Sequence, residues 1–169
     1  MKTLVESAKA AKAASLELAR LTTEAKNAAL RAMARALMEK SPEILAANEA
    51  DMQRGREGGM PESLLDRLML NEARIAGMAE GLEQVADLPD PIGRVMDEWT
   101  RPNGLVIRKV RVPMGVIGII YEARPNVTVD AAALAFKAGS GVKTDSFGST
   151  QPLVSCSPLS AAGRCGGAA

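Results

Sequence analysis

Residues 115–121 read Gly-Val-Ile-Gly-Ile-Ile-Tyr, a continuous apolar run that is rich in β-branched side chains. A run of this kind, without alternating polar residues, is typical of a strand buried on both faces of a sheet. The alanine-rich residues 129–137 follow and predict a helix that ends near Gly139. A buried strand followed by a helix predicts the first βα unit of a parallel sheet, so the expected fold class is α/β.

The chain upstream of this strand is predicted to be mostly helical. Apolar residues recur there at three- and four-residue spacing, with charged residues between them. Thr22 or Thr23 and Asn71 are expected to be N-caps, and Ser41 is expected to cap the third helix, with Pro42 at its first position. The predicted helices cover residues 4–21, a second segment that includes 29–37, then 42–57, 61–68 and 72–84.

Past the segment Pro89-Asp90-Pro91, the period of the pattern changes from that of a helix to that of a strand. Residues 105–112 are apolar and alternate with basic residues in their second half. Residues 96–100 are placed to pair with them across Pro102-Asn103-Gly104. Because Asn-Gly between two such runs is a strong turn signal, a β-hairpin is predicted here.

Composition excludes several classes of function. The chain has 169 residues, 47% of them apolar, and a net charge of +1, so no basic surface indicates nucleic acid. Aromatic residues are 2%, which disfavours base stacking, and histidine is absent, which excludes Ser-His-Asp catalysis and histidine-bound metal. No apolar run predicts a membrane span or a signal peptide, so a cytoplasmic protein is expected.

The chain divides into two unequal parts, 1–142 and 143–169. All but three of the charged residues lie in the first part, whereas the second is rich in Ser, Gly and Pro and is expected to be a disordered tail. We interpret this tail as translated out of frame, which the nucleotide sequence after the codon for Val142 would test. Its two cysteines, Cys156 and Cys165, fit no zinc spacing and lie in this out-of-frame tail, so neither is expected to be a nucleophile, a disulfide partner or a ligand.

The candidate functional residues are Tyr121, Arg124 and Asn126. They follow the buried strand, and open α/β sheets bind ligands at the carboxyl ends of their strands. Arg124 is suited to hold a carboxylate or phosphate, and Asn126 to donate a hydrogen bond to a developing oxyanion. The alternatives are that Arg124 pairs with Glu122 or a neighbouring helix, and that Asn126 only caps the next helix.

Two further motifs near this strand are given a plainer interpretation. Gly115 and Gly118 do not form a dinucleotide-binding GxGxxG pattern and are expected to allow close backbone packing. The sequence Asn126-Val127-Thr128 matches a glycosylation acceptor, but without a secretion signal it is not expected to be used.

Residues 110–134, Val-Arg-Val-Pro-Met-Gly-Val-Ile-Gly-Ile-Ile-Tyr-Glu-Ala-Arg-Pro-Asn-Val-Thr-Val-Asp-Ala-Ala-Ala-Leu, closely resemble the gamma-glutamyl phosphate reductase family, also called glutamate-5-semialdehyde dehydrogenases. Upstream stretches resemble the family in the same order, and the resemblance covers about residues 1–142. Through the Pro-x-Gly-Val-Ile-Gly pattern the family is similar to aldehyde dehydrogenases. The upstream stretches are residues 24–27, 47–51, 65–68 and 87–93.

The resemblance implies an oxidoreductase of L-proline biosynthesis that reduces L-glutamate 5-phosphate to L-glutamate 5-semialdehyde and phosphate with NADPH. It implies a thioester on a catalytic cysteine that lies beyond residue 142, so no catalytic residue is assigned in this chain and no metal is expected. Tyr121, Arg124 and Asn126 are expected to form part of the substrate-binding wall. The implied fold is N-terminal helices, a β-hairpin and the first βα unit of an aldehyde-dehydrogenase-like sheet, truncated.

As a truncated reductase, the chain is expected to lack activity, and its open sheet edge predicts aggregation or a partly molten state. A homo-oligomer is the expected assembly, with no nucleic acid or membrane partner. Two alternatives remain: a non-catalytic helical interaction module, and a fragment that joins full-length subunits and poisons their oligomer.

Overall fold

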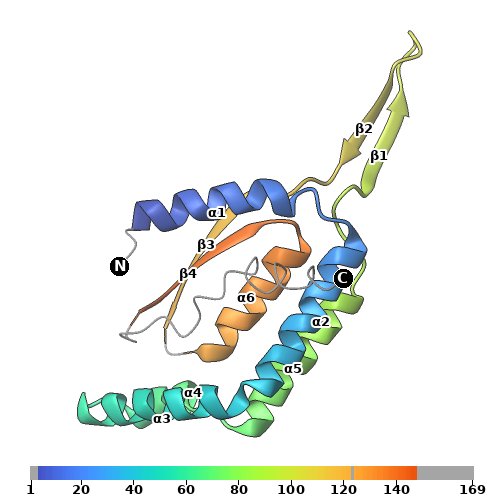
Figure 1. Cartoon of the computed structure of the whole chain (residues 1–169). Helices are drawn as coiled ribbons and strands as arrows, with labels where there is room; N and C mark the ends of the chain where they lie inside the picture. Colours follow the sequence, from blue (N-terminus) through green and yellow to red (C-terminus); the bar gives the residue numbers. More distant parts are fainter. Residues whose placement is uncertain (1–3, 123, 148–169) are drawn as a thin grey trace, which may run out of the picture.

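The computed structural model describes residues 4–122 and 124–147. In chain order it has five helices, an antiparallel hairpin and a parallel strand–helix–strand unit, so the predicted α/β class is confirmed (Figure 1). None of the helices in these residues has the length and apolar character that crossing a membrane requires. The elements are α1 (Leu4–Leu18), α2 (Thr23–Glu39), α3 (Ser41–Glu57), α4 (Glu62–Leu68), α5 (Glu72–Asp87), β1 (Val95–Thr100), β2 (Val106–Val110), β3 (Val116–Glu122), α6 (Pro125–Lys137) and β4 (Gly141–Phe147).

The main core lies where α2, α5 and α6 pack together (Figure 1). Leu30 from α2, Leu82 from α5 and Phe136 from α6 are buried in one cluster. The predicted apolar face of the second helix is confirmed, because its other members pack against this cluster. Those members are Ala29, Met33 and Leu37.

Side-chain caps form at the starts of α2 and α5. Thr22 accepts a hydrogen bond from the Ala25 amide at 3.2 Å, and Asn71 accepts one from the Arg74 amide at 2.7 Å, as predicted. The prediction that Ser41 caps the third helix is wrong. Lys40 is the N-cap and Ser41 is already helical, because only Lys40 separates α2 from α3 and its carbonyl accepts from the Ile44 amide.

The predicted hairpin is confirmed and extends away from the helices (Figure 1). Thr100 lies opposite Val106, and the residues between them form the turn. Gly104 has φ of +84°, a backbone conformation that costs glycine little and other residues more. Every residue of β1 is exposed, so the hairpin leaves apolar side chains such as Trp99 open to solvent.

The strands β3 and β4 pair in parallel, from Val116 opposite Gly141 to Glu122 opposite Phe147. Helix α6 connects them and ends at Lys137, followed by its C-cap Ala138 and by Gly139, whose φ is +63°. The Gly139 amide donates to the Phe136 carbonyl at 2.9 Å and the Ser140 amide to the Ala135 carbonyl at 2.8 Å, which is the glycine-terminated helix end that the sequence predicts.

Two expectations for this unit need correction. The strand at residues 115–121 is not buried on both faces, because Ile120 is 77% exposed. Among residues 4–122 and 124–147 its single hydrogen-bonded neighbour is β4, and α1 and α6 pack more extensively on β4 than on β3. The disordered tail was expected from residue 143, whereas β4 continues to Phe147. Residues 148–169, with Cys156 and Cys165, lie outside the described residues.

Candidate binding cleft at the start of helix α6

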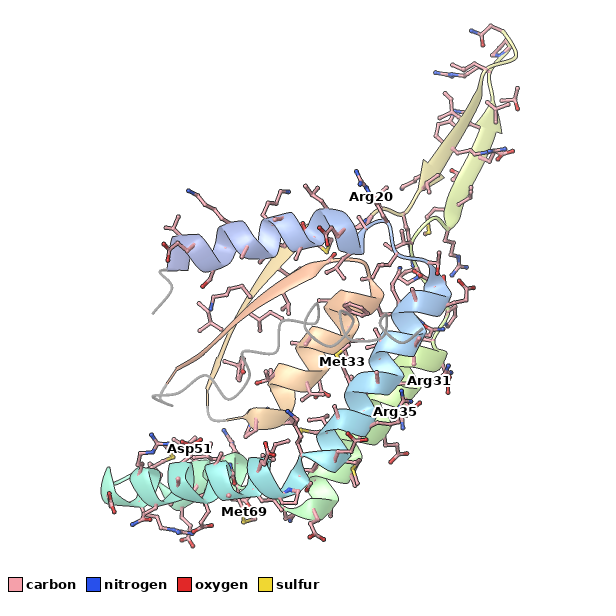
Figure 2. The ribbon with its side chains drawn as sticks, in the orientation of Figure 1. Arg20, Arg31, Met33, Arg35, Asp51 and Met69 are labelled. Atoms are coloured by element: carbon pink, nitrogen blue, oxygen red, sulfur yellow. The ribbon has the colours of Figure 1, made fainter. Side chains whose placement is uncertain are left out.

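A cleft of about 440 Å³ lies between the α4–α5 region and the N-terminal end of α6. Its volume is within the range of roughly 300–1,000 Å³ that is common for ligand pockets. Met69, labelled in Figure 2, marks the α4–α5 connection that forms one wall. The residues that line the cleft are Asp66, Arg67, Met69, Leu70, Arg74, Gly77, Met78, Arg124, Pro125, Asn126 and Asp130.

Arg74 holds the end of α4 in place. Its Nη1 atom donates to the carbonyl oxygen of Asp66 at 2.5 Å and to that of Met69 at 2.6 Å, while Nη2 lies 3.2 Å from Asp66 Oδ1. These carbonyl groups belong to the last turn of a helix, where no intrahelical donor is available. These contacts occupy the guanidinium group of Arg74, which therefore stabilises the wall of the cleft.

Asn48, from α3, holds the next residues of the same wall. Its buried amide Nδ2 donates to the Leu68 carbonyl at 2.9 Å, and its Oδ1 accepts from the Leu70 amide at 2.7 Å. Sequence reasoning did not select Asn48. The available signal was an asparagine in the middle of a helix, where this residue type is disfavoured unless its side chain bonds elsewhere.

Arg124 and Asn126 both line the cleft, as expected for residues at the carboxyl end of β3. Arg124 is exposed and has no ion-pair partner among the described side chains, which do not include that of Glu122. The alternative that Asn126 caps the helix is wrong, because Arg124 is the N-cap and Asn126 lies within the first turn of α6. Both side chains are therefore available to a ligand.

Tyr121 does not line the cleft. Its ring is partly buried, and its hydroxyl group forms a hydrogen bond with Thr128 Oγ1 in the second turn of α6. The contact ties the end of β3 to the helix that follows it. Arg67, which sequence reasoning did not select, is exposed on α4 and lines the cleft instead, without an ion pair to any described residue.

The turn between β3 and α6 does not fit the dinucleotide cofactor that the resemblance implies. A dinucleotide usually lies against a glycine-rich turn and the free amides of a helix N-terminus. The turn between β3 and α6 contains no glycine, and Pro125 removes one amide from the start of the helix. In the part of the chain that is described, no group of acidic, histidine or cysteine residues has the arrangement of a metal site.

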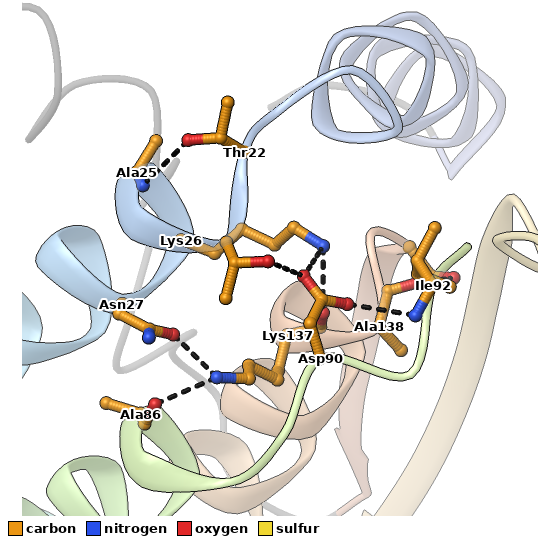
Figure 3. Close-up of polar contacts among 11 residues, drawn as sticks. Thr22, Ala25, Lys26, Asn27, Ala86, Asp90, Ile92, Lys137 and Ala138 are labelled. Atoms are coloured by element: carbon orange, nitrogen blue, oxygen red, sulfur yellow. Dashed lines mark hydrogen bonds and ion pairs between the residues drawn. The ribbon is translucent and has the colours of Figure 1, made fainter. Parts of the chain in front are cut away.

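The other end of α6 is held by a buried polar cluster of Lys26, Asp90 and Lys137 (Figure 3). Lys26 Nζ lies 2.6 Å from Asp90 Oδ2 and 3.3 Å from the carbonyl oxygen of Lys137. Lys137 Nζ donates to Asn27 Oδ1 at 2.5 Å and to the Ala86 carbonyl at 2.8 Å. The cluster thus joins α2, the end of α5 and α6.

Burial and hydrogen bonding shift two pKa values in this cluster. Burial alone would raise the pKa of Asp90, but hydrogen bonds from Lys26, the Ile92 amide and Thr23 outweigh it and hold that pKa below its usual value. Burial lowers the pKa of Lys137, although the nearby Asp90 carboxylate partly opposes this change. Both shifts mean that the folded protein binds protons less readily here than the unfolded chain does.

Sequence relatives of this chain are gamma-glutamyl phosphate reductases. It is 60% identical to that of Heliobacterium modesticaldum over 134 residues, which are 79% of this chain and 32% of the relative. It is 60% identical to that of Moorella thermoacetica over 140 residues, 80% of this chain and 34% of the relative. The chain thus spans about a third of the length of the curated relatives it matches. No protein-family model matches it.

Two solved structures are also similar. The crystal structure of gamma-glutamyl phosphate reductase from Thermotoga maritima superimposes with a TM-score of 0.83 and 47% identity, covering 86% of this chain and 35% of that one. The crystal structure of gamma-glutamyl phosphate reductase from Saccharomyces cerevisiae gives a TM-score of 0.78 and 29% identity, covering 88% of this chain and 38% of that one.

The helical layer, the hairpin and the β3–α6–β4 unit with its cleft define part of an α/β protein with a parallel sheet. More specifically, the chain is a homologue of gamma-glutamyl phosphate reductase and matches an N-terminal portion of that protein. The resemblance to the gamma-glutamyl phosphate reductase family is confirmed.

Proposed function

We propose that this chain forms the N-terminal portion of an NADPH-dependent reductase that converts L-glutamate 5-phosphate to L-glutamate 5-semialdehyde and phosphate in L-proline biosynthesis. The observation that carries the proposal is the cleft, which brings Arg124 and Asn126 together at the carboxyl end of β3. That is where parallel sheets bind ligands. Homology to gamma-glutamyl phosphate reductases supplies the substrate and the reaction.

In this proposal the described residues bind and orient the substrate. The guanidinium group of Arg124 is suited to an anionic end of the substrate, through two parallel hydrogen bonds. The amide of Asn126 is suited to donate a hydrogen bond to oxygen as negative charge develops on it, which is a common source of transition-state stabilisation. The N-terminal end of α6 adds a partial positive charge on the same side.

The remaining chemistry is assigned to residues outside the described ones. The thiolate that displaces phosphate must come from a cysteine, and the described residues contain none. NADPH supplies the hydride when bound, and the β3–α6 turn does not fit it. We therefore expect the 169-residue chain to be inactive by itself, and turnover with NADPH and freshly generated glutamyl phosphate would contradict this expectation.

A chimeric enzyme tests the proposal directly. Residues 1–142 of this chain would replace the matching N-terminal segment of the Thermotoga maritima reductase, to which the chain is 47% identical. We expect NADPH consumption that depends on glutamyl phosphate. A chimera that folds, as judged by circular dichroism and a cooperative melt, but has no activity would contradict the proposal.

A second candidate function is a module that joins reductase subunits, and the exposed hairpin favours it. Apolar side chains line both strands, with Trp99 42% and Val106 49% exposed. Exposed apolar area of this kind often marks a protein contact. Co-purification of the chain with a full-length reductase, lost in Trp99→Lys, would support it, whereas a chain that stays separate would exclude it.

A further inference from the structure

The cleft contains one carboxylate that is not neutralised within the described structure. Asp130, in α6, is exposed and forms no ion pair or hydrogen bond with any described residue. Asp66, the other carboxylate of the cleft, is occupied by Arg74. An acidic group left open in a cleft that also carries unpaired arginines indicates a ligand with charges of both signs.

The positions of the charged groups suit such a ligand. Asn126 and Asp130 are four residues apart and so share one face of α6, separated by about 6 Å along the helix axis. Arg67 contributes from α4, on the opposite wall of the same cleft. Helix α6 is held at its C-terminal end, and Asn48 and Arg74 hold the wall at residues 66–70. The charged groups of the cleft therefore lie on elements whose positions are fixed by other contacts.

We propose that Asp130 and Arg67 bind the amino-acid head group of an acidic α-amino acid, Asp130 taking its α-ammonium and Arg67 its α-carboxylate. This inference rests on the proposed function, which supplies the substrate class and leaves Arg124 and Asn126 for the reacting end. A phosphate group alone does not explain the site, because Asp130 would repel it. A substrate with a cationic and an anionic group on one carbon satisfies both residues.

The test measures binding of three small probes to the 169-residue chain by nuclear magnetic resonance titration. L-glutamate carries the whole head group, glutarate lacks the α-ammonium, and 4-aminobutyrate lacks the α-carboxylate. We expect L-glutamate to bind roughly tenfold more tightly than either, since one charged hydrogen bond is lost in each analogue. Equal binding of glutarate and L-glutamate by the folded chain, or no binding of L-glutamate, would overturn the proposal.

Substitutions of Asp130 and Arg67 test which residue binds the α-ammonium group and which binds the α-carboxylate group of the ligand. Asp130→Asn is expected to abolish the preference over glutarate, and Arg67→Gln the preference over 4-aminobutyrate. Arg35→Gln is the matched control, because Arg35 is exposed on α2, lies away from this cleft and has no ion pair among the described residues (Figure 2). The proposal is also wrong if Arg35→Gln removes either preference as completely as the cleft variants do.

The chimeric reductase separates this inference from the proposed function. There, Asp130→Asn should raise KM for glutamyl phosphate roughly tenfold with little change in kcat, because the head group is bound equally in the ground state and the transition state. An active chimera whose KM is unchanged by Asp130→Asn overturns the head-group site and leaves the proposed function intact. An inactive chimera, together with an isolated chain that prefers L-glutamate, overturns the proposed function and leaves the head-group site intact. If the isolated chain does not fold, the KM measurement alone decides.

Discussion

Lys26 Nζ and Asp90 Oδ2 lie 2.6 Å apart, and their side chains are only 3% and 11% exposed. The pair links the first turn of α2 to the segment between α5 and β1, which are distant in sequence. A buried ion pair is stabilising only if its remaining hydrogen bonds are made, and here Thr23, the Ile92 amide and the Lys137 carbonyl make them.

Asp90→Asn should destabilise the fold strongly. The change leaves the buried ammonium group of Lys26 without a counter-charge, which costs about 3 kcal/mol in the free energy of unfolding. Asp87→Asn is the matched control, because Asp87 pairs with Arg31 at 2.7 Å but is 70% exposed, and an exposed pair contributes about 1 kcal/mol or less. Urea unfolding of both variants measures the difference, and equal losses would contradict the prediction.

The free energy of unfolding should also depend on pH through the ionisation of Asp90. Its pKa is lower in the folded protein than the ordinary value of 3.8, so its contribution is complete above that value and is lost as the pH falls through the folded pKa. The free energy of unfolding should therefore decrease below about pH 4, more steeply than in Asp90→Asn. Urea unfolding across this range measures both slopes, and parallel curves would exclude Asp90 as the cause.

Asn48→Ala should release the wall of the cleft. The substitution leaves the Leu68 carbonyl and the Leu70 amide without partners, which we expect to cost about 2 kcal/mol. Gln53→Ala, an exposed change in the same helix, should have little effect. Hydrogen exchange at Leu70 supplies the local measurement, and slow exchange in Asn48→Ala would show that another group holds this segment.

Two glycines should respond to alanine in opposite directions. Gly104 has φ of +84°, so Gly104→Ala should destabilise the hairpin turn by about 1 kcal/mol. Gly77 lies in α5 with no atom within 4 Å of an added Cβ, so Gly77→Ala should stabilise the fold by up to about 1 kcal/mol. Hydrogen exchange in β1 and β2 reports the first change and thermal unfolding the second. The same sign for both would contradict this assignment.

Sequence reasoning succeeded for most of the local signals, with the Ser41 cap as the exception. The caps Thr22 and Asn71, the Asn103-Gly104 turn and the glycine after α6 each follow from a few neighbouring residues, and all are present. It failed where the outcome depended on distant contacts. The exposure of Ile120 is set by how few elements cover β3, and β4 forms from a segment whose composition indicates a loop.

The candidate site shows the same division. Arg124 and Asn126 were selected because the carboxyl end of a parallel strand is a general place for ligands, and both line the cleft. Asp130 was not selected, although it lies one turn after Asn126 in α6. Arg67 and Asn48 were not selected, because they come from α4 and α3 and only folding brings them to this cleft and its wall. A single sequence contains no signal for such long-range proximity.

The attachment of α6 has a consequence for binding energetics. Its C-terminal end is fixed by the Lys137 contacts, and the opposite wall is fixed by Asn48 and Arg74. A ligand that enters between them meets a preorganised surface, so most of the entropic penalty of ordering that surface has been met during folding rather than on association. Affinity in this cleft should consequently depend more on the chemical complementarity of the ligand than on any rearrangement of the protein.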